Sequence, residues 1–263
     1  MAIIFDGRKF AADKEQILKE KVSKLKSSAK LVSILVGEDK ASILYTNLKQ
    51  KAAGRVGIDF EVKKFAKDVT APELISEIEK LNKDKKVTGI MVQLPLPEKL
   101  KSKTLKIVNA IDKKKDVDGL TKNSPYLPAT VKGILEVIKI ATTPLAYFGK
   151  KAAVVGASGA VGKSTITELK KLGYKICECD KDTRDLYAKL HQVDLVVSAT
   201  GVANLIKGEM LKEGVIAIDV GSPVGDLEFK SAVNVANFIT PVPGGVGPVT
   251  IVSLLENLVE AVN

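Results

Sequence analysis

The sequence predicts an α/β protein whose parallel sheets are divided between two domains. Short apolar runs, typical of buried strands, alternate with segments whose apolar residues recur at helical spacing, from one end of the chain to the other. A glycine-rich turn, "VVGASGAVGKST" at 154–165, lies between a predicted strand and a predicted helix. This alternation is typical of parallel sheets that carry helices on both faces.

Seven apolar runs are predicted to form strands, three in the first half of the chain and four in the second. They are residues 31–37, 59–65, 87–94, 152–157, 174–180, 193–200 and 214–221. Segments between them, such as "APELISEIEKLNKD", carry apolar residues at helical spacing. The last segment, "GPVTIVSLLENLVEAVN", follows a proline-glycine turn and is predicted to be a helix that crosses back to the first domain.

The segment "NSPYLPATVKGILEVI", in which a proline-containing stretch gives way to a predicted helix, predicts the domain boundary. A helix is expected after Pro128 with Thr130 as its N-cap, and "TTPLAYFGK" then leads into the strand before the glycine turn. We therefore expect residues 1–129, together with the C-terminal helix 244–263, to form one domain. Residues 130–243 are expected to form the other.

The composition favours a soluble cytoplasmic protein. No stretch reaches the roughly 18 uninterrupted apolar residues that span a bilayer, and the N-terminus does not resemble a signal peptide. The net charge of +10 can attract anionic partners. However, the lysines are spread along amphipathic segments, and the seven Phe and five Tyr form no aromatic-basic stacking motif. We expect no membrane partner and no nucleic-acid partner.

The two cysteines, Cys177 and Cys179, are predicted to be reduced thiols on one face of a strand. Residues two apart in a strand have Cα atoms too far apart to bridge easily. Two thiols also cannot complete the tetrahedral shell of zinc, and the only histidine, His191, is distant in sequence and is expected at an exposed helix end. The sequence therefore predicts no metal site.

The glycine turn allows two interpretations, the phosphate loop of an ATPase or the turn of a dinucleotide-binding fold. The ATPase loop needs a glycine five residues before the "GKS" that begins at Gly162, and Ala157 occupies that position. Gly156, Gly159 and Gly162 instead match the turn at which a dinucleotide pyrophosphate meets a helix N-terminus. This match predicts a Rossmann-type, doubly wound parallel sheet for the second domain.

The end of the following strand carries opposing signals for the choice of dinucleotide. An acid at this position favours the ribose 2′-hydroxyl of NAD, and a base favours the 2′-phosphate of NADP. Asp180 and Lys181 are adjacent here, and Arg184 follows one turn later. These residues alone leave the choice open.

The first half of the chain contains a second group of candidate residues. Ser42, Tyr45 and Lys49 share one face of a predicted helix, which follows a strand whose carboxyl end is where open α/β sheets bind ligands. Gln93 ends an apolar strand and needs a backbone or ligand partner. Taken alone, the helix face is also compatible with an exposed polar stripe.

An acidic turn, "KKKDVDGL", completes this group. Asp116 and Asp118 flank a valine in a turn that Gly119 closes. Acidic turns are common, and Asp116 is expected to form the turn.

In combination, these motifs resemble those of the bifunctional methylenetetrahydrofolate dehydrogenase/cyclohydrolase family over nearly the whole chain. The matching segments, in order, are the Tyr45-x-x-x-Lys49 helix, "VQLPLP" (92–97), "KDVDG" (115–119), "VGAS" with the following "VG" (155–162), "IDVG" (218–221) and "TPVPGGVGP" (240–248). The chain departs from the family at Ala129 and Val131, where the hinge is usually Pro-Cys-Thr-Pro, at Ser164, where many members have proline, and in the shorter loop "DVGSPVGD".

The resemblance implies two α/β domains with the active site in the cleft between them, and two reactions. The enzyme would transfer hydride from 5,10-methylenetetrahydrofolate to a nicotinamide and then hydrolyse the methenyl product to 10-formyltetrahydrofolate. Lys49 is the candidate for moving protons, because an amine in a partly desolvated site beside a cationic substrate loses part of its preference for the charged form. Gln93 would hold Lys49 or the water, Tyr45 would stack on the substrate, and Asp118 would bind the pterin N–H groups.

The resemblance also implies a cofactor site, a substrate site and partners. NADP is the expected cofactor because Lys181 can reach a 2′-phosphate and most of the family uses NADP, with NAD as the alternative. The expected cofactor-binding residues are Gly156, Ala157, Ser158, Gly159, Val161, Gly162, Lys181, Thr200, Gly201 and Ser222. The expected substrate-binding residues are Tyr45, Gln93, Asp118, Pro243, Gly244 and Gly245.

The partners implied are a folate that can carry a polyglutamate tail and a second copy of the chain bound through the nucleotide domain. Two other functions stay open, a monofunctional NAD-dependent dehydrogenase of the same fold and a non-catalytic nucleotide-binding protein.

Overall fold

The computed structural model describes residues 1–142 and 149–262. Most of the segment "TTPLAYFGK" and the terminal Asn263 therefore lie outside the described residues. Contacts divide the chain into two compact units, each of which contains one sheet. The three-stranded unit comprises Ala12–Ala129 and Ile251–Asn263, and the six-stranded unit comprises Met1–Ala11 and Thr130–Thr250. The first residues of the chain thus group with the six-stranded unit, whereas the sequence analysis assigned them to the first domain.

The three-stranded unit is built on the central strand β2, which pairs in parallel with a strand on each side. Its strands are β2 (Lys30–Val36), β3 (Asp59–Phe65) and β4 (Gly89–Val92). Its helices are α1 (Gly7–Ser23, from Ala12 onward), α2 (Lys40–Val56), α3 (Ala71–Lys83), α4 (Glu98–Lys101), α5 (Thr104–Val108), the 3-10 turn η1 (Lys113–Lys115) and the end of α10 (Val246–Val262).

Helix α2 begins and ends where the sequence provides caps. The Asp39 carboxylate accepts the Ser42 N–H at 2.8 Å, which satisfies a backbone donor that has no partner within the helix. The helix stops at Gly57, which has φ 83° and takes the left-handed conformation that glycine adopts at little cost. Helix α2 is therefore fixed at both ends, immediately after β2.

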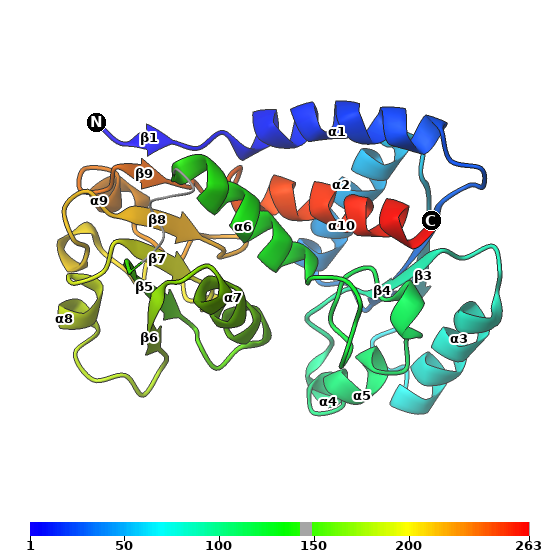
Figure 1. The fold of residues 1–263 in the computed structure, drawn as a ribbon. Coiled ribbons are helices and arrows are strands. Elements are labelled where there is room, and N and C mark those ends of the chain that lie inside the picture. The colour runs from blue at the N-terminus through cyan, green and yellow to red at the C-terminus, as the bar shows by residue number, and fades with distance from the viewer. Residues whose placement is uncertain (143–148, 263) are drawn as a thin grey trace. The chain divides into compact units, whose positions relative to one another are not determined.

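The six-stranded unit contains a single parallel sheet in the order β1-β9-β8-β7-β5-β6 (Figure 1). Its strands are β1 (Ile3–Ile4), β5 (Lys151–Val155), β6 (Lys175–Cys179), β7 (Leu195–Ser198), β8 (Ile216–Asp219) and β9 (Phe238–Ile239). Its helices are α6 (Ala129–Ala141, from Thr130), α7 (Ala160–Lys171), α8 (Leu186–Leu190), α9 (Phe229–Ala232), the 3-10 turn η3 (Gly208–Met210) and the start of α10.

Both faces of this sheet are buried, as parallel strands require. Val154 and Val197 pack against α6, α7 and the start of α10 on one face. Val155 and Val196 pack on the opposite face in a cluster that includes Leu190 of α8. Successive residues of each strand thus enter different cores, which explains why these strands are apolar without alternation.

The predicted α/β class with parallel sheets is confirmed. All seven predicted strands are present: the prediction of 59–65 matches β3 at both ends, and the other six have shifted ends. The prediction of Thr130 as an N-cap is wrong, because α6 already begins at Ala129. Strands β1 and β9 were not predicted, since two residues are too few to give a periodic pattern. His191 is exposed at the end of α8, as expected. No helix among the described residues combines the length and apolarity needed to cross a bilayer.

Asn257 of α10 connects the last helix to the acidic turn within the three-stranded unit. Its Nδ2 donates to the Val117 carbonyl at 2.9 Å and to the Leu127 carbonyl at 3.0 Å. Asn257→Leu should lower the free energy of unfolding by about 1–3 kcal/mol, because it leaves two inward-facing carbonyls unpaired. The shift in the midpoint of urea denaturation measures this.

Asn234→Leu is the matched control. Its Nδ2 also donates to a backbone carbonyl, that of Lys230 at 3.0 Å, but at an exposed position where water replaces the bond. Equal midpoints for the two variants would show that Asn257 does not anchor the turn.

Candidate active site

One face of α2 carries the polar residues singled out in the first half of the chain. Ser42, Thr46 and Lys49 are buried, whereas Leu44 and Leu48 on another face of the helix are exposed. The exposed polar stripe that the sequence also allowed is therefore wrong. The face that holds Lys49 packs toward β4, because Lys49 contacts Met91 of β4 and Gln93, which directly follows β4.

Among the described residues, the Lys49 amine contacts three groups that carry no charge. Its Nζ donates to Gln93 Oε1 at 2.9 Å and lies 3.7 Å from Met91 Sδ. It also lies 4.6 Å from the centroid of the Tyr45 ring, one helical turn earlier. The side chain is only 4% exposed, and the described residues place no carboxylate oxygen within hydrogen-bonding distance of Nζ. A buried lysine without a carboxylate partner is rare in folded proteins.

Gln93 is held so that its carbonyl oxygen faces Lys49. Its backbone N–H donates to the Ile34 carbonyl at 2.8 Å, which continues the β2–β4 pairing by one residue. Its side-chain Nε2 donates to the Leu94 carbonyl at 2.7 Å. With the amide nitrogen engaged there, Oε1 is the atom that accepts from Lys49.

Burial controls the protonation of Lys49. Removal from water disfavours the ammonium and lowers the pKa of Lys49 to about 8, while the charge of Asp118 opposes this shift. Burial also raises the pKa of the Asp118 carboxyl, while Lys49 lowers it and Asp116 raises it. The two groups thus influence one another electrostatically, and the amine can exchange its proton close to neutral pH.

The two carboxylates of the acidic turn differ in their surroundings. Asp116 is fully buried and accepts the Leu120 N–H at 3.2 Å, the Thr121 N–H at 2.8 Å and the Thr121 hydroxyl at 2.7 Å. It forms the turn, as expected. Asp118 is half-buried, and its backbone carbonyl accepts the Ala129 N–H at 3.2 Å. Its carboxylate thus remains for an interaction with Lys49 or a ligand.

The structure adds Met91, Ser33 and Thr46, which the sequence analysis did not identify. Ser33 lies opposite Met91 in the β2–β4 register, and the buried hydroxyls of Ser33, Thr46 and the already noted Ser42 have no hydrogen-bond partner among the described residues. The serine inside the apolar run "LVSILVG" is the sequence signal that could have revealed Ser33. Met91 gave no signal, because methionine is an ordinary core residue.

The glycine turn of the six-stranded unit has the geometry that a dinucleotide pyrophosphate requires. Gly156 has φ 89°, and a Cβ there would lie 2.5 Å from the Ala199 carbonyl oxygen. A Cβ on Gly162 would collide with the Gly156 carbonyl oxygen. Helix α7 begins at Gly159 without a side-chain cap, so its first N–H groups remain for a ligand. Ala157 is buried here, Ser158 is exposed and Val161 is half-buried.

The acidic residue at the end of β6 is engaged in its own turn. Asp180 Oδ1 accepts the Asp182 N–H at 3.0 Å, and the Asp180 N–H donates to Thr183 Oγ1 at 2.8 Å. Lys181 and Arg184 are both exposed. The cationic side chains at this strand end are therefore freer to meet a phosphate than Asp180 is to meet a ribose hydroxyl.

Two buried aspartates shape the loops that carry Thr200, Gly201 and Ser222. Asp226 Oδ2 accepts the Thr200 N–H at 2.6 Å and the Ser198 hydroxyl at 2.8 Å. Asp219 accepts backbone N–H groups of 221, 226 and 227, and burial raises the pKa of its carboxyl. Gly201 and Ser222 are exposed on these loops. The sequence analysis did not identify either aspartate as the residue that orders the loops.

The predicted substrate residues fall in both units. Tyr45, Gln93 and Asp118 belong to the three-stranded unit. Residues 243–245 belong to the six-stranded unit, where the Gly245 N–H donates to the Pro241 carbonyl at 2.8 Å and Gly245 is buried. Contact with substrate remains a prediction for all of them.

Comparison with known proteins assigns the family. Residues 5–118 match the model of the tetrahydrofolate dehydrogenase/cyclohydrolase catalytic domain, and residues 128–263 match that of its NAD(P)-binding domain. The chain is 42% identical to the bifunctional protein FolD of Moorella thermoacetica, over 99% of this chain and 98% of the relative.

Solved structures agree. The FolD dehydrogenase/cyclohydrolase of Campylobacter jejuni is 37% identical, with a TM-score of 0.91 over 100% of this chain and 99% of that one. The Trypanosoma brucei FolD, solved with NADP and an inhibitor, is 31% identical, with a TM-score of 0.92 over 99% of this chain and 97% of that one. The chain therefore belongs to the tetrahydrofolate dehydrogenase/cyclohydrolase family.

Proposed function

We propose that this chain is a bifunctional enzyme that oxidises 5,10-methylenetetrahydrofolate with NADP and hydrolyses the resulting 5,10-methenyltetrahydrofolate to 10-formyltetrahydrofolate. The observation that carries the proposal is the buried Lys49 amine, which Gln93 Oε1 holds at 2.9 Å and which no carboxylate in the described part of the chain contacts. A non-catalytic nucleotide-binding protein would have no need to bury a cation in this way, because desolvating it costs free energy.

The dehydrogenase step needs orientation more than proton transfer. NADP, when bound, supplies the nicotinamide that accepts the hydride. The chain would hold the pterin through Asp118, whose carboxylate can accept two N–H donors side by side, and through the ring of Tyr45. Holding the one-carbon bridge in one position converts an encounter into a reaction within a complex.

The hydrolysis step needs proton transfer. Water adds to the cationic methenyl carbon and loses one of its protons. The C–N bond to the ring nitrogen then breaks as the formyl C=O forms, the ring nitrogen gains a proton, and the remaining hydroxyl proton is released to solvent. Lys49, with a pKa near 8, can accept the first proton and return it to the leaving nitrogen. Gln93 would hold the amine in place throughout, because its own amide nitrogen is fixed to the Leu94 carbonyl.

The glycine turn of the six-stranded unit fits the cofactor. Gly156, Gly159, Gly162 and the free N–H groups at the start of α7 would hold the pyrophosphate. Lys181 would bind the 2′-phosphate, and the NADP in the solved Trypanosoma brucei relative supports this choice. The family resemblance further supports a cytoplasmic homodimer formed through the six-stranded unit and a folate substrate that carries a polyglutamate tail.

Lys49→Met should reduce cyclohydrolase activity by roughly 10²–10⁴-fold, the usual contribution of general acid-base catalysis, and reduce dehydrogenase activity far less. Methionine keeps most of the apolar stem and removes only the amine. Methenyltetrahydrofolate should therefore accumulate, which its absorbance measures. Lys51→Met, at an exposed position on the same helix, is the control. If both activities fell by one factor in a folded protein, Lys49 would act only in positioning.

Two further variants distinguish the residue that holds the Lys49 amine from the residue that holds the substrate. Gln93→Ala should give a milder version of the Lys49→Met bias, because the amine stays but loses its acceptor. Asp118→Ala should weaken both activities together, because both reactions use the same bound folate. Separate assays of methenyltetrahydrofolate formation and decay read both effects, and a selective loss of hydrolysis in Asp118→Ala would contradict the assignment.

The cofactor assignment predicts that kcat/KM for NADP exceeds that for NAD by roughly tenfold or more, the equivalent of one charge-assisted contact. Lys181→Ala should remove most of this preference by lowering kcat/KM for NADP alone. Lys230→Ala, which removes an exposed lysine on α9 of the same unit, is the control. Equal or better use of NAD by the unmodified enzyme would show that Asp180 selects the ribose hydroxyl.

A further inference from the structure

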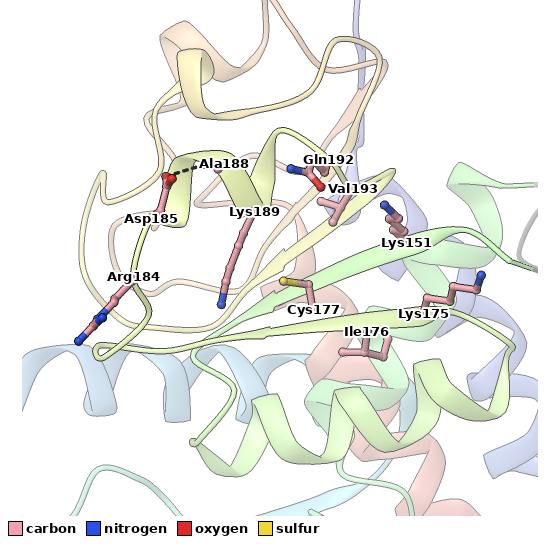
Figure 2. Close-up of a pocket in the computed structure, with 10 residues that line it drawn as sticks. All are labelled: Lys151, Lys175, Ile176, Cys177, Arg184, Asp185, Ala188, Lys189, Gln192 and Val193. Carbon is pink, nitrogen blue, oxygen red and sulfur yellow. Dashed lines mark hydrogen bonds between the residues drawn. The ribbon is translucent and has the colours of Figure 1, made fainter.

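The six-stranded unit contains a pocket that the proposed reactions do not use. It has a volume of about 350 Å³ and lies where β6 meets α8 (Figure 2). Residues of β6, of α8 and of the segments next to them line it, together with Lys151 at the start of β5. Neither the glycine turn at 156–162 nor the Asp180–Thr183 turn contributes a lining residue. The pocket is therefore distinct from the expected pyrophosphate site.

Four cationic side chains line this pocket, and their charges are not balanced. They are Lys151, Lys175, Arg184 and Lys189. None of the four side chains forms an ion pair with a described residue, although many other lysines of the protein do. The one carboxylate of the lining, Asp185, is engaged as the N-cap of α8, where it accepts the Ala188 N–H at 3.0 Å. Four cations against one carboxylate leave an excess of positive charge in the lining, which favours the binding of an anion.

The lining also has an apolar part and a thiol. Ile176, Ala188 and Val193 supply the apolar surface, and Cys177 presents its side chain between the basic groups. Figure 2 shows Lys189 reaching from α8 toward β6, with Lys151 and Lys175 at one end of the pocket and Arg184 extending at the other. The volume is within the range of small-molecule sites. A ligand with several negative charges could meet cations at more than one point.

We propose that this pocket binds a small metabolite that carries a polyphosphate group, at a site separate from the dinucleotide. Lys175 and Lys189 would contact the phosphates as point charges, with Lys151 and Arg184 at the two ends. The apolar lining would cover the rest of the ligand. The inference does not depend on the proposed function, because no residue of the pocket is assigned to proton transfer or to folate binding. Arg184, which also lies at the strand end expected to meet the cofactor phosphate, is the one lining residue that the two sites could share.

Cys177 provides a probe inside the pocket. Its thiol and that of Cys179 lie 3.8 Å apart, but Cys179 is buried, and burial raises the pKa of the Cys179 thiol to about 12, so iodoacetamide should modify Cys177 first. Inorganic tripolyphosphate, added to the full protein saturated with NADP, should slow this alkylation. At ten times its Kd the slowing should be roughly tenfold. Peptide mass spectrometry identifies the modified cysteine.

A double variant, Lys175→Gln with Lys189→Gln, should abolish the protection. The rate of Cys177 alkylation in this variant is compared with and without tripolyphosphate, so that the variant serves as its own reference. The control pair, Lys19→Gln with Lys24→Gln, removes the same charge from exposed lysines at the end of α1 and should leave protection intact. Calorimetric titration of both variants with tripolyphosphate gives the same comparison without the thiol.

Three results would overturn the proposal. Absence of protection would show that the pocket does not bind the anion. Equal loss of binding in both variant pairs would show that only net charge attracts it. Protection that occurs without NADP and disappears when NADP is saturating would show that tripolyphosphate occupies the dinucleotide site instead.

Discussion

The chemistry that we propose for this protein depends on a buried amine whose hydrogen-bond partner is uncharged. Lys49 donates to Gln93 Oε1 at 2.9 Å and lies beside the thioether of Met91 and the ring of Tyr45. A carboxylate in contact would hold the proton permanently, and open water would keep the pKa above 10. Burial with neutral neighbours lowers the pKa to about 8, where the amine can both take and return a proton.

Strand pairing, helix caps and a hydrogen-bonded turn of the three-stranded unit maintain this arrangement. The parallel pairing of β2 with β4 places Met91 and Gln93 at the strand end, and the caps of α2 fix the helical turn that carries Tyr45 and Lys49. The Asp116 carboxylate closes the turn that holds Asp118. Asn257 ties α10 to the backbone on both sides of that turn. The side chains of the site come from several elements of one unit, so the site is no more stable than the unit that supports it.

Much of this could be predicted from the sequence, because each signal lay in a single segment. The Tyr45 and Lys49 spacing placed both residues on one face of α2, the polar Gln93 ended an apolar strand, and the glycine order of 156–162 marked the dinucleotide turn. The family resemblance joined these segments, and the comparisons confirm it.

The rest could not be predicted, because it depends on contacts between distant segments. Met91 is an ordinary apolar residue until β4 packs beneath α2, and Asp219 and Asp226 order loops through bonds that local patterns do not indicate. The strands β1 and β9 are two residues long, and they form because β9 pairs with β8 and β1 pairs with β9. The position of Thr130 was misjudged because the helix starts directly after Pro128, at Ala129.

The most direct test is an NMR titration of the protein labelled with ¹³C at the lysine ε-carbons, with the Lys49 signal assigned by its loss in Lys49→Met. The account predicts that Lys49 titrates with a midpoint near pH 8, well below the ordinary value for a lysine of about 10.4. A Lys49 signal with a midpoint at that ordinary value would show a permanently charged amine at neutral pH. The proton-transfer role, and with it the account of the site, would then be wrong.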